Sequence, residues 1–401
     1  MAAGWKPPQN PTAEVARNIA EEKPLISNQW KSRTAREVPL QASLMMVRRT
    51  SAFFPFMVKN ELRWYRGARR PHQDAGVFVF VEAVMSDEHE QFLRRSGEMM
   101  DFYHKGDYAS ALAVTERLAS EFPGQAQETT YWRICLLSRL NKIEAALDTF
   151  DKALEGGLWW SETTLRRDPD LEPLQGLPEF ESLVGLSERS HVSAQATTRP
   201  EMLVREPTAD STGPYPLVMV LHGQGGSAEG NLRFWQPACS LGWLVASLQS
   251  AQMAWPGAYA WEDQDKAQEQ VLGQFESLCG KYPVDRSRVI FGGISQGAAL
   301  AIRLTLNGSA PVRGFLAVVP GQIQQELLTK WIATRRNQPV RGYIVAGGKD
   351  PRYTFFKQVC ETLAQYGIAC KLEDHPEMGH EFPPAFEQSL KTGFDYLLAK
   401  E

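Results

Sequence analysis

Residues 284–300 read VDRSRVIFGGISQGAAL and contain the most informative local pattern of the chain. The apolar run Val289–Phe291 predicts a β-strand, and the alanines that follow Ser295 predict the start of a helix. Gly293 and Gly297 stand two residues before and two residues after this serine. A sharp turn from a strand into a helix leaves almost no room for side chains at those two positions. The pattern therefore predicts a strand, a tight turn and a helix, with the Ser295 hydroxyl above a sheet.

On both sides of this segment, residues 188–401 alternate short apolar runs with helical patterns. The predicted strands are Leu217–Leu221, Trp243–Leu248, Val289–Phe291, Phe315–Val319, Tyr343–Val345 and Ala369–Leu372. The predicted helices are Gln264–Cys279, Gln296–Leu306, Gln322–Thr334, Tyr353–Tyr366 and Pro384–Leu398. Such alternation predicts an α/β fold with a doubly wound, mostly parallel sheet that helices cover on both faces. Ligands bind to such sheets at the carboxyl ends of the strands.

A nucleophilic serine needs a general base, and the base needs a carboxylate that orients it. In this fold class we expect the order Ser, Asp or Glu, His, with each residue just after a strand. Asp350 follows the predicted strand Tyr343–Val345 in the sequence Ala-Gly-Gly-Lys-Asp. Asp374 and Glu381 are the alternatives for the acid. The position after a strand and the chain order favour Asp350.

The base is expected near the C-terminus, after the predicted strand Ala369–Leu372. His380 lies there in Met-Gly-His-Glu, and His375 is its alternative. His375 stands directly at the strand end and precedes Pro376, which favours a structural role. His222 belongs to an earlier glycine-rich loop. We therefore expect His380 to be the base.

The glycine-rich loop His222–Gly226 directly follows the predicted strand Leu217–Leu221. Acyl transfer creates an oxyanion that needs two backbone N–H donors, one after the nucleophile and one from a loop after an earlier strand. These would be the amides of Gln296 and Gln224, and Gly223 would let the loop approach a substrate closely. The alternative is an ordinary glycine-rich turn between a strand and a helix.

Together these motifs resemble the phospholipase/carboxylesterase group of α/β-hydrolases, which includes acyl-protein thioesterases. The resemblance runs from about residue 214 to the end. The motifs that carry it are His222–Gly226, Val284–Gly297, Gly347–Asp350 and Gly379–His380. It implies Ser295 as nucleophile, Asp350 as orienting acid and His380 as base. It also implies an oxyanion hole from the amides of Gln224 and Gln296, and chemistry without a metal or an organic cofactor.

An aromatic loop, QMAWPGAYAW at residues 252–261, follows the strand that ends near Leu248 and should lie over the same sheet edge. Its side chains Trp255, Tyr259 and Trp261 either line an acyl or aryl pocket or only anchor the loop by packing. No long insertion separates Val319 from Tyr343, so no lid is built into the sheet, and the helical N-terminal region is expected to shield the site.

Before the catalytic part, residues 1–84 show no sustained period and many prolines, which predicts a poorly ordered basic extension. Met85 could be the authentic start. Residues 85–187 look helical, and Gly106–Leu112 is echoed by Asn141–Leu147 at an offset of 35 residues. This echo resembles tetratricopeptide repeats, and such a region could hold a protein or peptide partner. The alternative is an ordinary helical bundle packed on the catalytic domain.

Charge and cysteine content narrow the class of protein. Residues 1–84 carry 13 Lys and Arg against 7 Asp and Glu, whereas the remainder carries 30 against 40. The acidic main body argues against a nucleic-acid partner. The five cysteines are widely spaced and lack a C-x-x-C pair, which indicates free thiols in a reducing compartment. Without an apolar run of membrane-spanning length or a secretory signal, we expect a cytoplasmic protein.

The sequence therefore predicts a serine hydrolase that cleaves small-molecule carboxylic esters or thioesters through a Ser-His-Asp triad and an acyl-enzyme. One alternative keeps the serine chemistry but cleaves peptides, as in prolyl-oligopeptidase-like enzymes. Another is an interaction protein whose helical repeats hold a partner while the hydrolase domain is vestigial.

Overall fold

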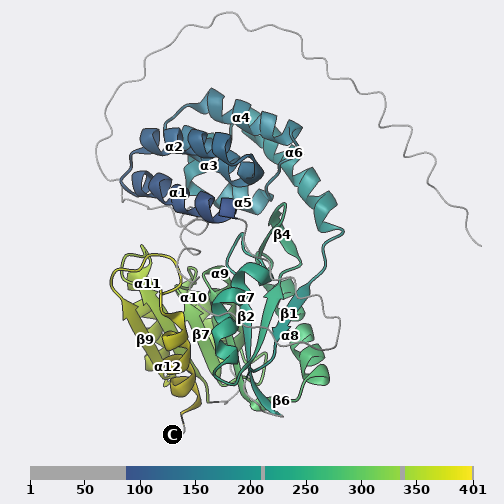
Figure 1. Cartoon of the computed structure of the whole chain (residues 1–401), viewed down its shortest axis with the longest axis vertical. Helices are drawn as coiled ribbons and strands as arrows, with labels where there is room; N and C mark the ends of the chain where they lie inside the picture. The colour runs from purple at the N-terminus through teal and green to yellow at the C-terminus, as the bar shows by residue number, and fades with distance from the viewer. Residues whose placement is uncertain (1–86, 209–212, 335–338, 400–401) are drawn as a thin grey trace, which may run out of the picture. The chain divides into compact units, whose positions relative to one another are not determined.

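A computed structural model of the chain describes residues 87–208, 213–334 and 339–399. The expected extension over residues 1–84 and the proposed start at Met85 lie outside the described residues. Within the described part, an all-helical region comes first and a sheet flanked by helices follows (Figure 1).

The helices of the first region form one apolar core. They are α1 Asp87–His104, α2 Tyr108–Glu121, α3 Ala126–Arg139, α4 Ile143–Glu155, α5 Glu162–Arg167 and α6 Pro178–Gln195, with 3-10 turns at η2 Pro123–Gln125 and η3 Pro169–Leu174. The two echoed segments lead into α2 and α4, and each places a fully buried alanine, Ala111 and Ala146, in the core. Phe92 stacks on Trp132 with ring centroids 5.6 Å apart. Small and large side chains thus interlock between neighbouring helices.

Helix α6 continues to Gln195 and so crosses residue 187, where the sequence analysis placed the end of the helical region. The buried hydroxyl of Ser187 connects the middle of this helix to the loop before α5. It donates to the carbonyl of Trp160 at 2.7 Å and accepts the N–H of Trp160 at 2.9 Å. The middle of α6 is therefore tied to the helical core, and the helix passes through this point without a break.

The second region is built on a seven-stranded sheet in the order β1-β3-β2-β6-β7-β8-β9. Its strands are β1 Glu201–Arg205, β2 Tyr215–Leu221, β3 Leu244–Gln249, β6 Val284–Ile294, β7 Gly314–Val318, β8 Arg341–Gly347 and β9 Cys370–His375. β1 pairs antiparallel with β3, and the other pairs are parallel. All six predicted strands are present, and the predicted doubly wound, mostly parallel α/β fold is confirmed.

Helices cover both faces of this sheet (Figure 1). They are α7 Ala228–Trp235, α8 Gln264–Lys281, α9 Gln296–Leu306, α10 Gln325–Thr334, α11 Tyr353–Gln365 and α12 Phe386–Leu398, with a 3-10 turn at η4 Gln236–Cys239. Alternate residues of β2 enter different cores. Leu217 and Met219 pack with Phe275 of α8, whereas Val218 and Val220 pack with Trp235 of α7. This alternation explains why the buried strands read as continuous apolar runs.

A small hairpin links the two regions. It consists of β4 Gln252–Trp255 and β5 Ala258–Ala260, and four of its residues belong to the apolar core of the helical region. The carbonyl of Ala254 accepts the N–H of Ser161 at 2.7 Å. The N–H of Met253 donates to the side chain of Gln195 at 2.8 Å. Hydrogen bonds and apolar packing therefore join the hairpin to the helices.

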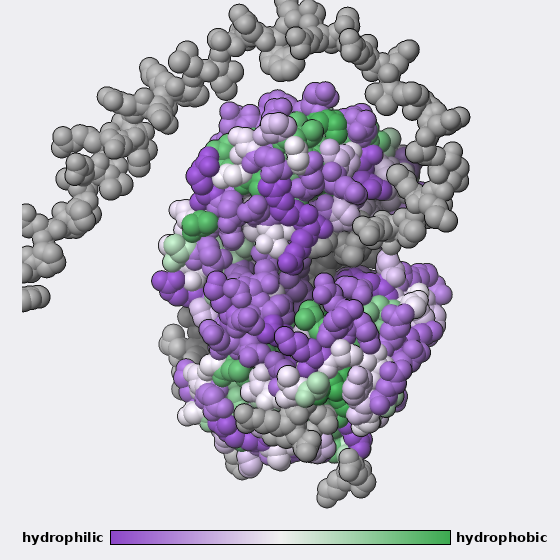
Figure 2. Space-filling view, turned by 180° about the vertical axis from the view of Figure 1, so that it is seen from behind, coloured by the Kyte–Doolittle hydropathy of each residue, from purple (hydrophilic) through white to green (hydrophobic). Residues whose placement is uncertain are grey.

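The described surface is largely polar. Figure 2 shows one face of the molecule, where hydrophilic residues cover most of the surface and hydrophobic residues form small separate patches. Among the described helices, none combines the length and apolar character needed to cross a membrane. The five cysteines are free thiols, and the sulfur atoms of Cys360 and Cys370 lie 2.8 Å apart.

Candidate active site

Ser295 lies on the tight turn between β6 and α9. Its backbone has φ 53° and ψ −119°, a left-handed conformation that costs a non-glycine residue free energy. Hydrogen bonds hold it there: its N–H donates to the carbonyl of Val318 at 3.1 Å, and its carbonyl accepts the N–H of Gly321 at 2.8 Å. The turn predicted from residues 284–300 is therefore present, and its strain is supported by the neighbouring strand and loop.

The two glycines of the turn sit against backbone. A Cβ at Gly293 would lie 2.7 Å from the carbonyl oxygen of Leu221. A Cβ at Gly297 would overlap with the carbonyl oxygens of both Leu221 and His222. Only glycine fits at either position, because α9 begins directly against the end of β2.

Asp350 and His380 are in direct contact at the ends of neighbouring strands. Asp350 follows β8, His380 lies in the loop after β9, and their side chains are 0% and 1% exposed. Oδ2 of Asp350 lies 2.5 Å from Nδ1 of His380. The other oxygen, Oδ1, accepts the backbone N–H of Arg352 at 2.9 Å and its Nε–H at 3.2 Å. The carboxylate is therefore fixed on both sides.

The surroundings shift the pKa of both groups. Burial tends to raise the pKa of Asp350, but the hydrogen bond and charge of His380 and the charge of Arg352 outweigh it and hold this pKa below its ordinary value. Burial first, and then the positive charge of Arg352, lower the pKa of His380 to about 4 against the opposing hydrogen bond and charge of Asp350. At neutral pH the site therefore combines an ionised carboxylate with a neutral imidazole.

The alternative acids and base have other partners. Nε2 of His375 lies 2.7 Å from the Glu373 carboxylate. The carboxylate of Asp374 accepts the hydroxyl of Tyr353 at 2.8 Å, and that of Glu381 accepts the N–H of Gly379 at 3.4 Å. Among the candidate acids and histidines, the hydrogen bonds described here therefore bring Asp350 and His380 together.

The glycine-rich loop after β2 is held by His222, which is buried. Its Nδ1 lies 2.7 Å from the carbonyl of Gly223, and its Nε2 accepts the N–H of Ser250 at 3.2 Å. The imidazole stacks on Trp261 with ring centroids 4.9 Å apart. Burial lowers the pKa of His222 to about 4, so the ring is neutral and both nitrogens have structural partners.

The hairpin pairs with the same loop. The N–H of Gly225 donates to the carbonyl of Tyr259 at 2.8 Å, and the N–H of Tyr259 donates to the carbonyl of Gly226 at 3.1 Å. The indole of Trp255 lies so close to Gly225 that a Cβ there would be 2.5 Å from it. Tyr131 of α3 stacks on Trp255 with ring centroids 6.5 Å apart. The helical region therefore reaches the loop through the hairpin.

A cavity of about 750 Å³ lies at this edge of the sheet, and Ser295, Gln224 and Gln296 are among the residues that line it. Of the substrate-binding residues predicted from the sequence, Trp255 and Trp261 line the cavity, whereas Gly223 and Tyr259 are not among its lining residues. The helical region contributes Tyr131, Trp132, Thr164 and Arg167 to the lining, as expected of a region that shields the site.

Several lining residues were missed by sequence reasoning. Arg352 lines the cavity and contacts both members of the buried pair, yet a lone arginine two residues after an aspartate carries no motif signal. Tyr131, Trp132 and Arg167 come from helices whose packing against the hairpin is not encoded in local periodicity. No pattern in the sequence would have pointed to these four side chains.

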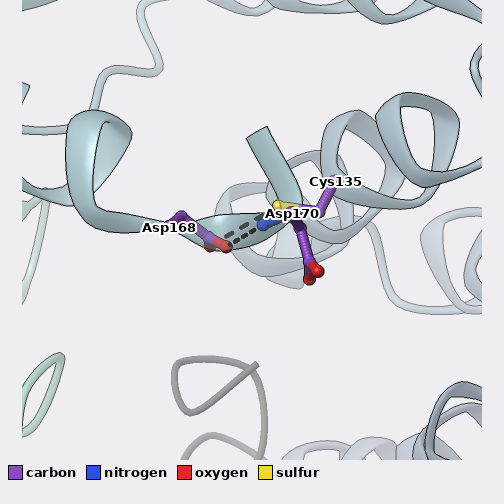
Figure 3. A group of neighbouring side chains, drawn as sticks. All are labelled: Cys135, Asp168 and Asp170. Carbon is purple, nitrogen blue, oxygen red and sulfur yellow. Dashed lines mark hydrogen bonds between the residues drawn. The ribbon is translucent and has the colours of Figure 1, made fainter. Parts of the chain in front are cut away.

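A second group of buried side chains lies within the helical region. The possible metal-ligand atoms of Cys135, Asp168 and Asp170 all lie within 4.8 Å of one another, and Figure 3 shows the three side chains. Tyr131 donates its hydroxyl to Asp168 at 2.7 Å, and Tyr103 donates its hydroxyl to Asp170 at 2.8 Å. Sulfur and carboxylate ligands suit zinc. Here, however, protein donors already occupy the carboxylates, and we interpret the cluster as an internal hydrogen-bond network.

Burial governs the ionisation of this network. Burial and the charge of Asp168 together raise the pKa of Asp170 to about 7, against the opposing hydrogen bond of Tyr103 and charge of Arg139. Burial also raises the pKa of Asp168. Arg139 lies 3.6 Å from Asp170 and opposes both shifts only in part. Two acidic groups thus stand close together in an apolar core, where one negative charge disfavours the other.

Comparison with known proteins agrees with this geometry. Residues 247–397 match the family model described as Phospholipase/Carboxylesterase. A chloroplastic protein of Arabidopsis thaliana is 30% identical to this chain over 101 residues, which is 25% of this chain. The match spans 30% of the length of that protein.

Three solved structures are among those similar to this chain. An uncharacterized protein of Bacillus cereus ATCC 10987 shares 21% identity, with 76% of this chain and 98% of that chain covered and a TM-score of 0.44. S-formylglutathione hydrolase (FrmB) of Staphylococcus aureus shares 14%, with 50% and 93% covered and a TM-score of 0.39. The Bacillus cereus carboxylesterase shares 16%, with 52% and 99% covered and a TM-score of 0.38. The observed sheet shows an α/β-hydrolase fold preceded by an all-helical region, and residues 247–397 of this fold match the phospholipase/carboxylesterase family.

Proposed function

We propose that this protein is a serine hydrolase that cleaves carboxylic esters or thioesters of small molecules through a covalent acyl-enzyme. One observation carries the proposal: Ser295 occupies a strained turn on the wall of a cavity that Arg352 also lines, and Arg352 contacts the buried pair of Asp350 and His380. This arrangement supports a nucleophile, a base and an orienting acid that act together at the carboxyl ends of β6, β8 and β9.

In the proposed acylation step, neutral His380 takes the hydroxyl proton of Ser295 while Oγ attacks the substrate carbonyl carbon. The carbonyl π bond becomes an oxyanion in a tetrahedral intermediate. Asp350 stabilises the imidazolium through Nδ1–H and remains ionised. When the intermediate collapses, His380 returns the proton to the departing alcohol or thiol, and the acyl group stays on Ser295.

In deacylation, water takes the place of the leaving group. His380 accepts a proton from the water, whose oxygen attacks the acyl-enzyme carbonyl. Collapse of the second intermediate breaks the bond to Ser295 Oγ, which recovers its proton from His380. The carboxylic acid is released, and the serine and imidazole return to their starting states.

The amides of Gln224 and Gln296 are the proposed oxyanion donors. Both residues line the cavity beside Ser295. The loop that carries Gln224 is fixed by His222 and by its pairing with the β4–β5 hairpin, and Gln296 is the first residue of α9. Donors fixed before the reaction stabilise a developing oxyanion without the cost of reorganisation.

The lining of the cavity supports a ligand of modest size. A volume of about 750 Å³ lies in the range of small-molecule sites. Indole rings of Trp132, Trp255 and Trp261 share the lining with several glutamine side chains. Ring faces together with amide groups favour an ester that offers both an apolar body and hydrogen-bonding groups.

The test is steady-state hydrolysis of p-nitrophenyl butyrate and of a butyryl thioester, with aminoacyl p-nitroanilides run in parallel. Removal of a triad nucleophile lowers kcat by about 10⁶-fold, so Ser295→Ala should be inactive on esters. Ser287→Ala is the matched control, since its hydroxyl bonds Asp285 at an exposed position. Anilide cleavage that exceeded ester cleavage would favour the peptidase alternative. Full ester activity in Ser295→Ala would refute the proposed nucleophile.

A further inference from the structure

Arg352 contacts both members of the Asp350–His380 pair. Its backbone N–H and its Nε–H both donate to Oδ1 of Asp350, and its Nη2 lies 2.6 Å from Nδ1 of His380. The arginine side chain is 12% exposed, and it lines the same cavity as Ser295. The guanidinium of Arg352 thus contacts the orienting acid and the base and also borders the cavity.

The two contacts at Nδ1 of His380 compete. A ring nitrogen of a neutral imidazole has one in-plane position, which holds either a proton or a lone pair. With the proton there, Nδ1 donates to Oδ2 of Asp350, 2.5 Å away. With the lone pair there, Nδ1 accepts from Nη2 of Arg352, 2.6 Å away. The guanidinium and the carboxylate therefore select opposite tautomers of the same ring.

The tautomer determines what the imidazole can do. When Nδ1 carries the proton, Nε2 has a lone pair and can take a proton from a serine hydroxyl. When Nδ1 accepts from Arg352, the ring proton is on Nε2, and the imidazole cannot act as a base. Contact between Arg352 and Nδ1 is thus incompatible with proton transfer from Ser295.

The other charged side chains of these loops have partners of their own. Lys349 pairs with Glu377 on the surface at 2.5 Å. Asp374 accepts the Tyr353 hydroxyl, and Glu381 accepts the N–H of Gly379. Among the described residues, Asp350 and Arg352 are the charged groups that shift the pKa of His380.

We propose that Arg352 is a positioning residue of this site, which orients Asp350 and competes with it for Nδ1 of His380, so that the guanidinium must turn toward the cavity before His380 can act as a base. This inference rests on the proposed function. In the resting site Arg352 competes with Asp350 for Nδ1 and so lowers the share of the productive tautomer, while burial is the main cause of the lowered pKa of His380. Entry of a substrate gives the guanidinium new partners in the cavity and frees Nδ1 to donate to Asp350.

The first test is the pH dependence of kcat/KM on p-nitrophenyl butyrate for the full chain. The acid limb of this profile, where kcat/KM falls as the pH is lowered, reports the protonation of the base in the free enzyme. Arg352→Met removes a positive charge next to His380, so the acid limb should move to higher pH by about one unit or more. Arg352→Lys keeps a charge and should stay within about half a unit of the unsubstituted protein. Lys349→Met, a neighbouring exposed cation, should leave the limb in place.

The second test is the tautomer itself, read from ¹⁵N NMR of labelled histidines with His380→Gln used to assign the signal. The unsubstituted protein should show a smaller share of His380 with its proton on Nδ1 than Arg352→Met does. If Arg352→Met fails to fold, Arg352→Gln serves both measurements, because it removes the charge while keeping a polar side chain.

The outcomes separate this inference from the proposed function. An acid limb that stays in place in Arg352→Met, with activity merely reduced, would mean a structural role only and would overturn the inference. A share of the Nδ1–H tautomer that is the same in the unsubstituted protein and in Arg352→Met would overturn it as well. In both cases ester hydrolysis by the unsubstituted protein would leave the proposed function standing, whereas absence of hydrolysis would count against that function instead.

Discussion

The carboxylate of Asp350 and the imidazole of His380 lie 30 residues apart in sequence and 2.5 Å apart in space, between Oδ2 and Nδ1. This contact joins the loops after β8 and β9, which are neighbours in the sheet. Both side chains are buried, so water cannot substitute for either partner. The orientation of the imidazole therefore depends on this carboxylate together with Arg352, the other side chain that contacts Nδ1.

Asp350→Asn should lower kcat for ester hydrolysis by about 10⁴-fold, because an amide no longer enforces the tautomer with the proton on Nδ1. The matched control is Asp374→Asn, whose carboxylate bonds the Tyr353 hydroxyl. That control should lose no more than a few-fold. Equal losses in both variants would contradict the assignment of Asp350.

Gly297→Ala should destabilise the fold as well as the site. Its Cβ would overlap with the carbonyl oxygens of Leu221 and His222, which are backbone atoms and cannot move independently. We expect a loss of about 3 kcal/mol or more in the free energy of unfolding. Gly273→Ala in the middle of α8 meets no atom within 4 Å and should instead add about 0.5–1 kcal/mol. Urea unfolding of both variants measures the contrast, and similar midpoints would refute the packing argument.

Gly225→Ala tests the loop that carries Gln224. Its Cβ would lie 2.5 Å from the indole of Trp255, so the loop must shift away from the hairpin. If the Gln224 amide is an oxyanion donor, kcat should fall by about 10²–10³-fold. Gly257→Ala is a matched control, since Gly257 has a similar positive φ of 77° but no atom within 4 Å. A fall of the same size in Gly257→Ala would trace the effect to backbone strain rather than to the indole.

Asp170 makes the stability of the protein depend on pH. Its folded pKa of about 7 lies above the ordinary value of 3.8, so between these values the folded state binds a proton that the unfolded state has lost. The stabilisation is complete below about pH 4 and is lost as the pH rises through about 7. Urea midpoints should therefore fall over this window, and Asp170→Asn should reduce the fall. Asp148→Asn, a surface change beside Lys152, should not. An unchanged slope in Asp170→Asn would contradict the account.

Most of the sheet could be predicted from sequence because its strands are buried on both faces and read as apolar runs. The edge strand β1 was missed, since its five residues are short, partly exposed and polar at both ends. Helix α7 was missed as well, because its eight residues follow directly on a glycine-rich loop without a long periodic pattern.

The parts of the site depend to different degrees on local sequence. These parts are the position of Ser295, the contact between Asp350 and His380, and the cavity lining. The turn at Ser295 could be predicted because its glycines are a local requirement. The choice of His380 over His375 needed chain order and position, and the structure adds the contacts that distinguish them. The roles of Arg352 and of Tyr131 depend on side chains that meet only through tertiary packing, so no local pattern could indicate them.

Covalent labelling with a fluorophosphonate probe tests the nucleophile most directly, because an activated serine becomes bound to phosphorus while ordinary hydroxyls do not react. Peptide mass spectrometry of the labelled full chain should place one probe on Ser295. Labelling should persist in Ser287→Ala and disappear in Ser295→Ala. A folded protein that takes up no probe, or that carries it on a different residue, would contradict the assignment of Ser295 as the nucleophile.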